Sequence, residues 1–257
     1  MLRTVTGSVT VFALTLGLSS VALGQTQPAQ QWSVITTVQI KPESRTEYEA
    51  AQKDVSAAYK KAGLQRLVVQ TILGDSNEYI SIVPLAKFAD MDSPSLLSSP
   101  SILPQPLVKK VTGYMAAMHR VAYLALNDIS IRTDMANAGE YAQVGVYHLA
   151  TGKAAAFTQF MKDDYLPAMR KADVANLWLS RPIFGGDLSD RVMVRPLHKL
   201  AELDGGPVLI KALGSEAATK VTDKQNSIVE SVHYSIVRVR PELSNMPAPP
   251  EKAKSGE

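Results

Sequence analysis

Eight stretches of the chain are rich in β-branched residues or alternate apolar with polar positions, which predicts eight β-strands. They cover Ser33–Lys41, Arg66–Gly74, Glu78–Leu85, His119–Leu126, Tyr141–Leu149, Ala175–Gly186, Arg191–Leu197 and Glu230–Arg240. Four longer stretches predict helices over Pro42–Gly63, Lys109–Met118, Thr151–Asp173 and Pro207–Val229. Pro167 lies inside the third helix and is expected to kink or break it.

The order strand, helix, strand, strand, helix, strand occurs twice, and short phrases recur with it. PLAKFADMD (84–92) and PLHKLAELD (196–204) share five of nine positions. KVT, VAY/VHY and YEAAQKD/FTQFMKD recur in the same order, about 110 residues apart. These repeated motifs predict a tandem duplication, with one repeat over 32–126, a linker over 127–140 and a second repeat over 141–243.

A β-α-β-β-α-β unit is the ferredoxin-like arrangement, a four-stranded antiparallel sheet with helices on one face. The other face is bare and has to be covered. Two such units can press their bare faces together, and the space between the sheets is then a natural place for a ligand. The predicted fold class is therefore α+β, with two ferredoxin-like units forming a pseudo-dimer within one chain.

The N-terminal segment carries Arg3 and then an apolar stretch from Val9 to Leu23. Small residues at Ala22 and Gly24 complete the pattern of a cleaved secretory signal over residues 1–24. The alternative is an uncleaved anchor, but the stretch is shorter than the roughly 20 residues of a spanning helix. We therefore expect an exported protein, periplasmic or extracellular, with no membrane attachment after cleavage. Residues 244–257 are expected to form a disordered tail.

Composition excludes several classes of function. The formal net charge of +3 is small and no basic stripe is present, so nucleic acid is not expected as a partner. The chain has no cysteine, which excludes disulfides and thiolate metal sites. Its four histidines show no metal-ligand spacing, and no glycine-rich phosphate loop occurs. We expect no metal and no cofactor.

The repeated unit, its length and the phrase P-L-x-K-[FL]-A-[DE] after the third strand resemble the dimeric α+β barrel superfamily. The nearest group is similar to antibiotic-biosynthesis monooxygenases, many of which pair two identical units. The resemblance implies a fused pseudo-dimer that binds a small molecule, with a further homo-oligomer left open. The resemblance extends equally to cofactor-free quinone-forming monooxygenases, haem-handling proteins and isomerases. This sequence contains no motif of one subfamily that would select among them.

Period-two alternation separates the two faces of each strand. The more apolar face is expected to contact the helices, and the mixed face is expected to line the space between the sheets. Residues expected toward the helices include Val34, Val38, Leu67, Val69, Ile80, Ile82, Val144, Val146, Leu177, Leu179, Val192, Val194, Val232 and Ile236.

The mixed face of the second repeat carries the candidate chemistry. His233 is a candidate general base, and Arg195 is a candidate partner for a carboxylate or enolate oxygen. Tyr147 and Trp178 are candidates for stacking on a flat aromatic substrate. The rest of the expected ligand pocket comprises Ser180, Met193, Gln39, Gln70 and Tyr79.

Three functions remain open on these residues. The first is an exported enzyme that oxidises or isomerises a small flat organic molecule without a metal. The second is a binding protein that holds a hydrophobic ligand or haem without turnover. The third is a structural pseudo-dimer, because Trp, Tyr and Arg are also enriched in interfaces.

Overall fold

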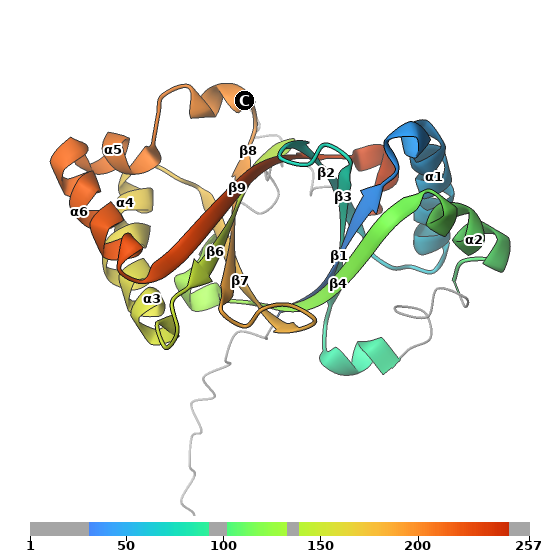
Figure 1. Ribbon diagram of the computed structural model, residues 1–257, viewed down its shortest axis with the longest axis horizontal. Coiled ribbons are helices and arrows are strands. Elements are labelled where there is room, and N and C mark those ends of the chain that lie inside the picture. Colours follow the sequence, from blue (N-terminus) through green and yellow to red (C-terminus); the bar gives the residue numbers. More distant parts are fainter. Residues whose placement is uncertain (1–30, 93–101, 133–138, 247–257) are drawn as a thin grey trace, which may run out of the picture.

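The structure is a computed structural model that describes residues 31–92, 102–132 and 139–246 (Figure 1). The expected signal over residues 1–24 and most of the expected tail lie outside these ranges. The first half contains β1 (Trp32–Ile40), α1 (Arg45–Lys61), β2 (Leu67–Leu73), β3 (Glu78–Leu85), α2 (Gln105–Gly113) and β4 (Met115–Ala125). A short strand, β5 (Ile131–Arg132), follows. The second half contains β6 (Tyr141–Leu149), α3 (Ala154–Phe160), α4 (Leu166–Lys171), β7 (Asn176–Phe184), β8 (Asp190–Leu197), α5 (Val208–Leu213), α6 (Ser215–Asn226) and β9 (Val229–Val239).

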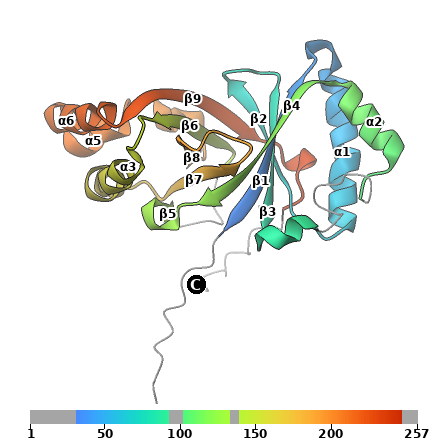
Figure 2. The same cartoon turned by 60° about the horizontal axis from the view of Figure 1, so that its bottom comes forward.

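Eight of these strands form a closed antiparallel barrel. Their order is β4-β1-β3-β2-β9-β6-β8-β7, and β4 also pairs with β7, which closes the circle. The strand order within the first half, β4-β1-β3-β2, is matched by β9-β6-β8-β7 in the second. Closure leaves none of these eight strands with a free edge. In Figures 1 and 2, α1 and α2 lie against one side of the barrel and α3 to α6 against the opposite side.

The expected strands are confirmed, and the helices differ in their bounds. Gly113 ends α2, and β4 begins at Met115, earlier than the expected His119. The expected break at Pro167 is confirmed as a π-helical turn over Met161–Tyr165 between α3 and α4. The last expected helix is divided into α5 and α6 at Gly214, whose φ of 79° belongs to the left-handed region.

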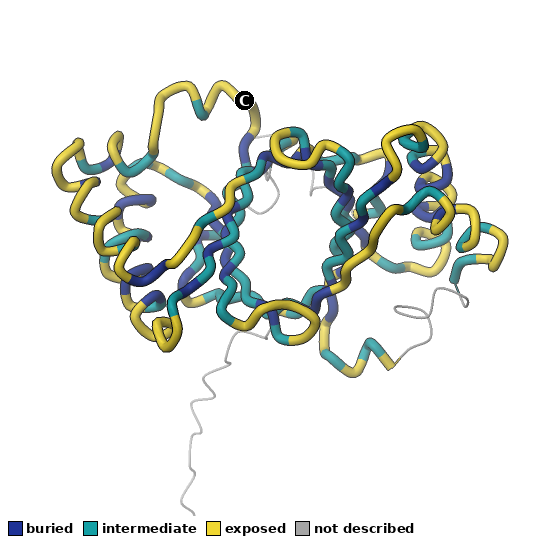
Figure 3. The backbone as a smooth tube through the Cα atoms, in the orientation of Figure 1, coloured by how far each residue is buried: buried dark blue, intermediate teal, exposed yellow. Residues whose placement is uncertain are grey.

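Three clusters of apolar side chains hold the molecule together. Figure 3 shows that buried residues occur both on the strands of the barrel and on the helices outside it. One lies between the first-half sheet and α1 and α2, and it includes Val38, Tyr48 and Tyr79. A second lies between the second-half sheet and its helices. The third joins residues of both halves on the inner face of the barrel, among them Val69, Val144 and Val237.

The face assignment made from periodicity is wrong for part of both halves. In the register of β1 with β3, Val38 is opposite Tyr79, and both contact the helices. Directly opposite residues share a face of the sheet, so the alternate residues point into the barrel. The residues that were expected toward the helices but lie on the inner face are Leu67, Val69, Ile80, Ile82, Val144, Val146, Val192 and Val194. Both faces of a barrel strand with outer helices are covered, so apolarity does not tell the inner face from the outer.

The segments after β4 and β9 each cross to the other half of the barrel. After β4, Ile131 of β5 pairs with Leu177 of β7, and Ile129 is buried in the second-half cluster. After β9, Asn245 pairs with Arg66 just before β2, and Leu243 is buried in the first-half cluster. The expected linker and the start of the expected tail therefore contain ordered segments that attach one half to the other.

Within the described ranges no helix is both long and apolar enough to cross a membrane.

Candidate functional site

Two adjoining cavities lie between the second-half sheet and its helices. The larger has a volume of about 640 Å³ and the smaller about 450 Å³, both within the range of small-molecule sites. Arg195 of β8 and Val208 of α5 line both cavities, so the two spaces are neighbours. The space that periodicity predicted between the two sheets is a different one.

The larger cavity has a mostly apolar wall with a few polar groups. Its polar lining includes Gln143, Tyr165, Arg195, Thr222, Gln225 and Tyr234. Its apolar lining includes Met169, Leu177, Met193, Leu203, Val208, Leu209 and Val232. Gly145 is required in this wall, because a Cβ atom there would lie 2.9 Å from ring atoms of both Tyr147 and Tyr234. Such a lining is suited to an organic molecule with a large apolar part.

Arg195 brings a cation to the junction of the two cavities. Its Nε atom is buried and has no hydrogen-bond partner. Burial lowers the pKa of its guanidinium, and the nearby Tyr165 and Glu202 act in the opposite direction. An arginine remains protonated in proteins, so this side chain keeps an unsatisfied donor beside an apolar space. A buried polar group of this kind costs free energy unless it acquires a partner.

Three tyrosines connect the interior of the larger cavity to its surface. The Tyr147 hydroxyl is 2.8 Å from that of Tyr234, and Tyr165 lies close enough to raise the pKa of Tyr147. Burial is the main cause that raises the pKa of Tyr165 to about 12 and the pKa of Tyr147 well above 10. The hydroxyls of Tyr147 and Tyr165 are therefore neutral at ordinary pH. Tyr234 is about half exposed, with 48% of its surface accessible.

Pro167 explains why Tyr165 lies where it does. A proline has no N–H for the carbonyl four residues earlier, and its ring clashes with that carbonyl. The chain widens into a π-helical turn that ends at Tyr165, and α4 resumes at Leu166. Turns of this kind occur frequently at functional sites. Sequence reasoning noted the break but missed Tyr165, and the proline two residues later was the signal that pointed to it.

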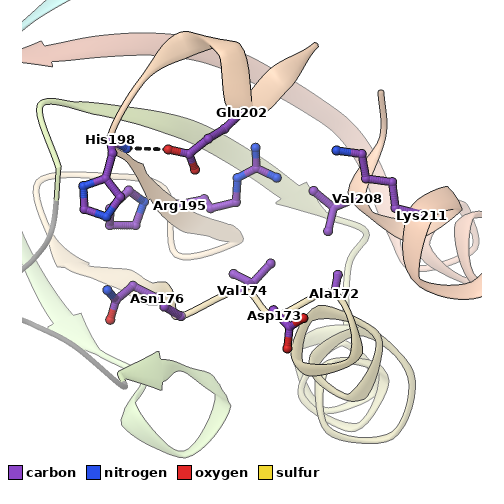
Figure 4. A pocket seen from close by; sticks show the side chains of 11 residues that line it. Ala172, Asp173, Val174, Asn176, Arg195, His198, Glu202, Val208 and Lys211 are labelled. Carbon is purple, nitrogen blue, oxygen red and sulfur yellow. Dashed lines mark hydrogen bonds between the residues drawn. The ribbon is translucent and has the colours of Figure 1, made fainter. Parts of the chain in front are cut away.

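Five ionisable side chains line the smaller cavity (Figure 4). Arg195, Lys211 and His198 line it together with Asp173 and Glu202. Glu202 accepts hydrogen bonds from the backbone amides of His198 at 2.7 Å and Lys199 at 3.2 Å. In Figure 4 the side chains of Arg195 and Lys211 are directed into the space beside Val208, and the carboxylate of Asp173 points away from Arg195.

The structure does not bring the expected catalytic residues together. Tyr147 is on the outer face, in the cluster that packs against the helices, and Arg195 lines the cavities there. His233 is opposite Val146 in the register, which places it on the inner face of the barrel. Its neighbour in β9, Tyr234, lines the larger cavity on the outer face. Because neighbouring residues of a strand point to opposite faces, His233 cannot reach a ligand held by Arg195.

The expected pocket residues are divided in the same way. Trp178, Ser180 and Gln39 lie on the inner face, by their pairing with Val194, Val192 and Glu78. Met193, Gln70 and Tyr79 lie on the outer face. Only Met193 of the six lines the larger cavity. Tyr79 and Gln70 instead contact Arg240, which holds Glu49 of α1 through two bonds of 2.8 Å. Those two residues therefore serve the packing of the first half.

The lining of the larger cavity does not fit a haem. Haem iron takes His, Cys, Tyr or a Met–His pair as axial ligands. This lining contains no His or Cys, and the raised pKa of Tyr165 disfavours the phenolate that ligates iron. Met169 and Met193 have no histidine beside them in the lining, and His198 belongs to the smaller cavity.

Neither a known protein-family model nor any curated protein matches the chain by sequence. Solved structures do match by fold. A candidate monooxygenase from Lactobacillus acidophilus NCFM has a TM-score of 0.56 at 12% identity, over 82% of this chain and 94% of that one. An anthrone oxidase-like protein has a TM-score of 0.54 at 8% identity, over 83% and 92%. A mutant chlorite dismutase from Candidatus Nitrospira defluvii has a TM-score of 0.52 at 12% identity, over 82% and 92%.

These likenesses establish the kind of fold. The chain shares a closed α+β barrel with these proteins. At identities of 8–12% the likeness does not extend to function.

Proposed function

We propose that this protein binds a small organic molecule in the larger cavity, between the second-half sheet and its helices. The single observation that carries the proposal is the joined pair of cavities with the unsatisfied donor of Arg195 at their junction. A natural protein retains a buried donor without a partner at a cost in stability. A ligand that accepts a hydrogen bond from Arg195 would remove that cost.

We further propose that dioxygen oxidises the ligand without a metal. A quinol would give up two electrons and two protons to become the quinone, and dioxygen would take them up as hydrogen peroxide. The names of two fold neighbours, a candidate monooxygenase and an anthrone oxidase-like protein, support oxidation as the reaction class. In this proposal Arg195 binds an oxygen atom of the substrate, and the hydroxyl of Tyr165 orients it from the opposite wall. A proton could leave the cavity from Tyr165 by way of Tyr147 and Tyr234, whose hydroxyls are 2.8 Å apart.

A screen of quinols and polyphenols tests both steps, with binding followed by calorimetry and turnover by oxygen consumption. We expect binding and turnover in the wild type, strong loss in Arg195→Gln, and no change in His233→Ala. His233→Ala is the matched control because its side chain lies on the inner face of the barrel. Loss in His233→Ala with retention in Arg195→Gln would move the site into the barrel. An iron–porphyrin absorbance band in the purified protein would favour haem binding instead.

Two further parts of the proposal concern the origin and location of the chain. We infer that the two halves, 32–126 and 141–243, derive from one duplicated ferredoxin-like unit. The equal strand order in the two halves supports this inference. The segments after β4 and β9 also support it, because each of them pairs with the other half of the barrel. We also propose export after removal of residues 1–24, which cell fractionation with N-terminal sequencing of the mature protein would test.

A further inference from the structure

The charges around the smaller cavity indicate which kind of ligand the site selects. Arg195 and Lys211 both line it, from β8 and α5. Figure 4 shows their side chains directed into the same space beside Val208. Two cations that share a space repel one another, and an anion between them removes the repulsion.

Neither acidic residue of the same lining accepts a hydrogen bond from the Nε atom of Arg195. Glu202 accepts hydrogen bonds from two backbone amides and caps the 3-10 turn over Leu200–Leu203. Asp173 follows α4, and its carboxylate points away from Arg195 (Figure 4). Glu202 is close enough to favour the charged form of Arg195, but the Nε donor of Arg195 has no partner. The arginine therefore has a donor left for a ligand.

The apolar space begins on the other side of the same arginine. Met169, Leu177 and Met193 line the larger cavity beside Arg195. A ligand that fills both spaces has its charged end at Arg195 and Lys211 and its apolar body against these side chains. We propose that the site selects an apolar organic acid, a carboxylate on an aromatic or aliphatic body, over a neutral molecule of the same shape. This inference rests on the proposed function, because it names the ligand class of that cavity.

Two probes that differ only in charge test the inference. 2-Naphthoate and 2-naphthamide share one ring system, and titration calorimetry at low salt gives both dissociation constants. Hydrogen bonds to a charged acceptor are roughly twice as strong as neutral ones, so we expect about tenfold tighter binding of the naphthoate. Arg195→Gln should remove this preference and leave naphthamide binding within about twofold of the wild type. Lys211→Gln should weaken naphthoate binding by a smaller factor.

Arg170→Gln is the matched control, since it removes the same charge from an exposed position in α4. It should leave both dissociation constants unchanged. Equal affinity for the two probes in the wild type would overturn the inference while leaving the proposed cavity site standing. Failure of both probes to bind would count against the proposed function itself.

If Arg195→Gln does not fold, the wild type still decides the matter. Raising the salt concentration from 0.02 to about 0.5 M shortens the Debye length several-fold. The naphthoate affinity should then fall toward the naphthamide value, which should itself stay constant. A naphthoate affinity that does not change with salt would contradict an ionic site.

Discussion

Ser130 and Ser244 occupy matching places at the two junctions between the halves of the barrel. The Ser130 hydroxyl accepts a hydrogen bond from the Leu179 amide at 3.0 Å and donates to the Leu126 carbonyl at 2.8 Å. The Ser244 hydroxyl accepts from the Val68 amide at 2.9 Å and donates to the Arg240 carbonyl at 2.8 Å. Each serine thus ties the segment after one half to the second strand of the other half.

Replacing either serine with alanine should lower the free energy of unfolding by about 1 kcal/mol, because a part-buried backbone amide loses its acceptor. The two effects should add in the double variant, since the sites share no partner. Urea unfolding followed by circular dichroism measures both. Ser227→Ala is the control, because its exposed hydroxyl only bonds to the Lys224 carbonyl at a helix end. Effects no larger than this control would show that the junctions do not depend on the serines.

Asp173 is the one residue other than glycine with a positive φ in the described ranges, at 55°. It follows α4 as Gly63, with a φ of 69°, follows α1, and both ends have the same pair of closing hydrogen bonds. Glycine adopts this conformation without strain. We therefore expect Asp173→Gly to raise the free energy of unfolding by about 0.5 kcal/mol, after its greater freedom in the unfolded chain is subtracted.

Asp204→Gly provides the control for this substitution. Asp204 has an ordinary φ of −61°, so the same change should destabilise the protein. Thermal unfolding of the two variants, compared at equal pH and salt, gives the sign of each effect. If Asp173→Gly is also destabilising, its carboxylate has a favourable interaction that outweighs the backbone strain.

The strands and their order follow from the sequence, whereas the position of the site does not. Turns and helix ends can be predicted from local sequence, because they depend on few neighbouring residues. Examples are Pro167, Gly63 and the repeated P-L-x-K motif. The face that Val69 or Tyr79 presents depends on pairing with strands far along the chain. Because helices outside and a second sheet inside both bury apolar side chains, periodicity identifies two faces without assigning them.

The alternation of residues along the strands also identified only part of the candidate site. Arg195, Met193 and Tyr147 were identified correctly as sharing one face, and the structure confirms that they do. Their grouping with His233 failed because β6 and β8 were assigned the opposite faces, whereas His233 of β9 lies on the inner face as expected. Lys211 and Tyr165 lie on helical segments, and the alternation of residues along strands carries no information about them.

Gly145 provides a test of the cavity wall. A methyl group at this position would approach the rings of Tyr147 and Tyr234 to 2.9 Å, closer than carbon atoms normally lie. Gly145→Ala should therefore destabilise the protein by about 1–3 kcal/mol and weaken binding of 2-naphthamide, because the tyrosines must move into the cavity. Gly113→Ala is the matched control, since nothing lies within 4 Å of its added methyl group. Equal behaviour of the two variants would show that this wall is able to yield.

His148 should make stability depend on pH near neutrality. Its Nδ1 atom lies 2.9 Å from Asp190 and 3.9 Å from Asp187, and its Nε2 atom lies 3.8 Å from Glu230. The hydrogen bond to Asp190 is the main cause that raises the pKa of His148 above its ordinary 6.5. A histidine whose pKa is raised by folding stabilises the folded state most fully below the unfolded pKa. That contribution is lost as the pH rises through the folded value.

We therefore expect the free energy of unfolding to fall as the pH rises above 6.5, and His148→Gln to flatten this part of the profile. Asp190→Asn should bring the pKa of His148 back toward 6.5, as followed by the imidazole proton resonances in an NMR titration. Because the imidazole is exposed, about 0.5 M salt should weaken the contributions of Asp187 and Glu230 more than that of the direct Asp190 contact. A His148 resonance that titrates at 6.5 in the wild type would remove this explanation for any pH dependence observed.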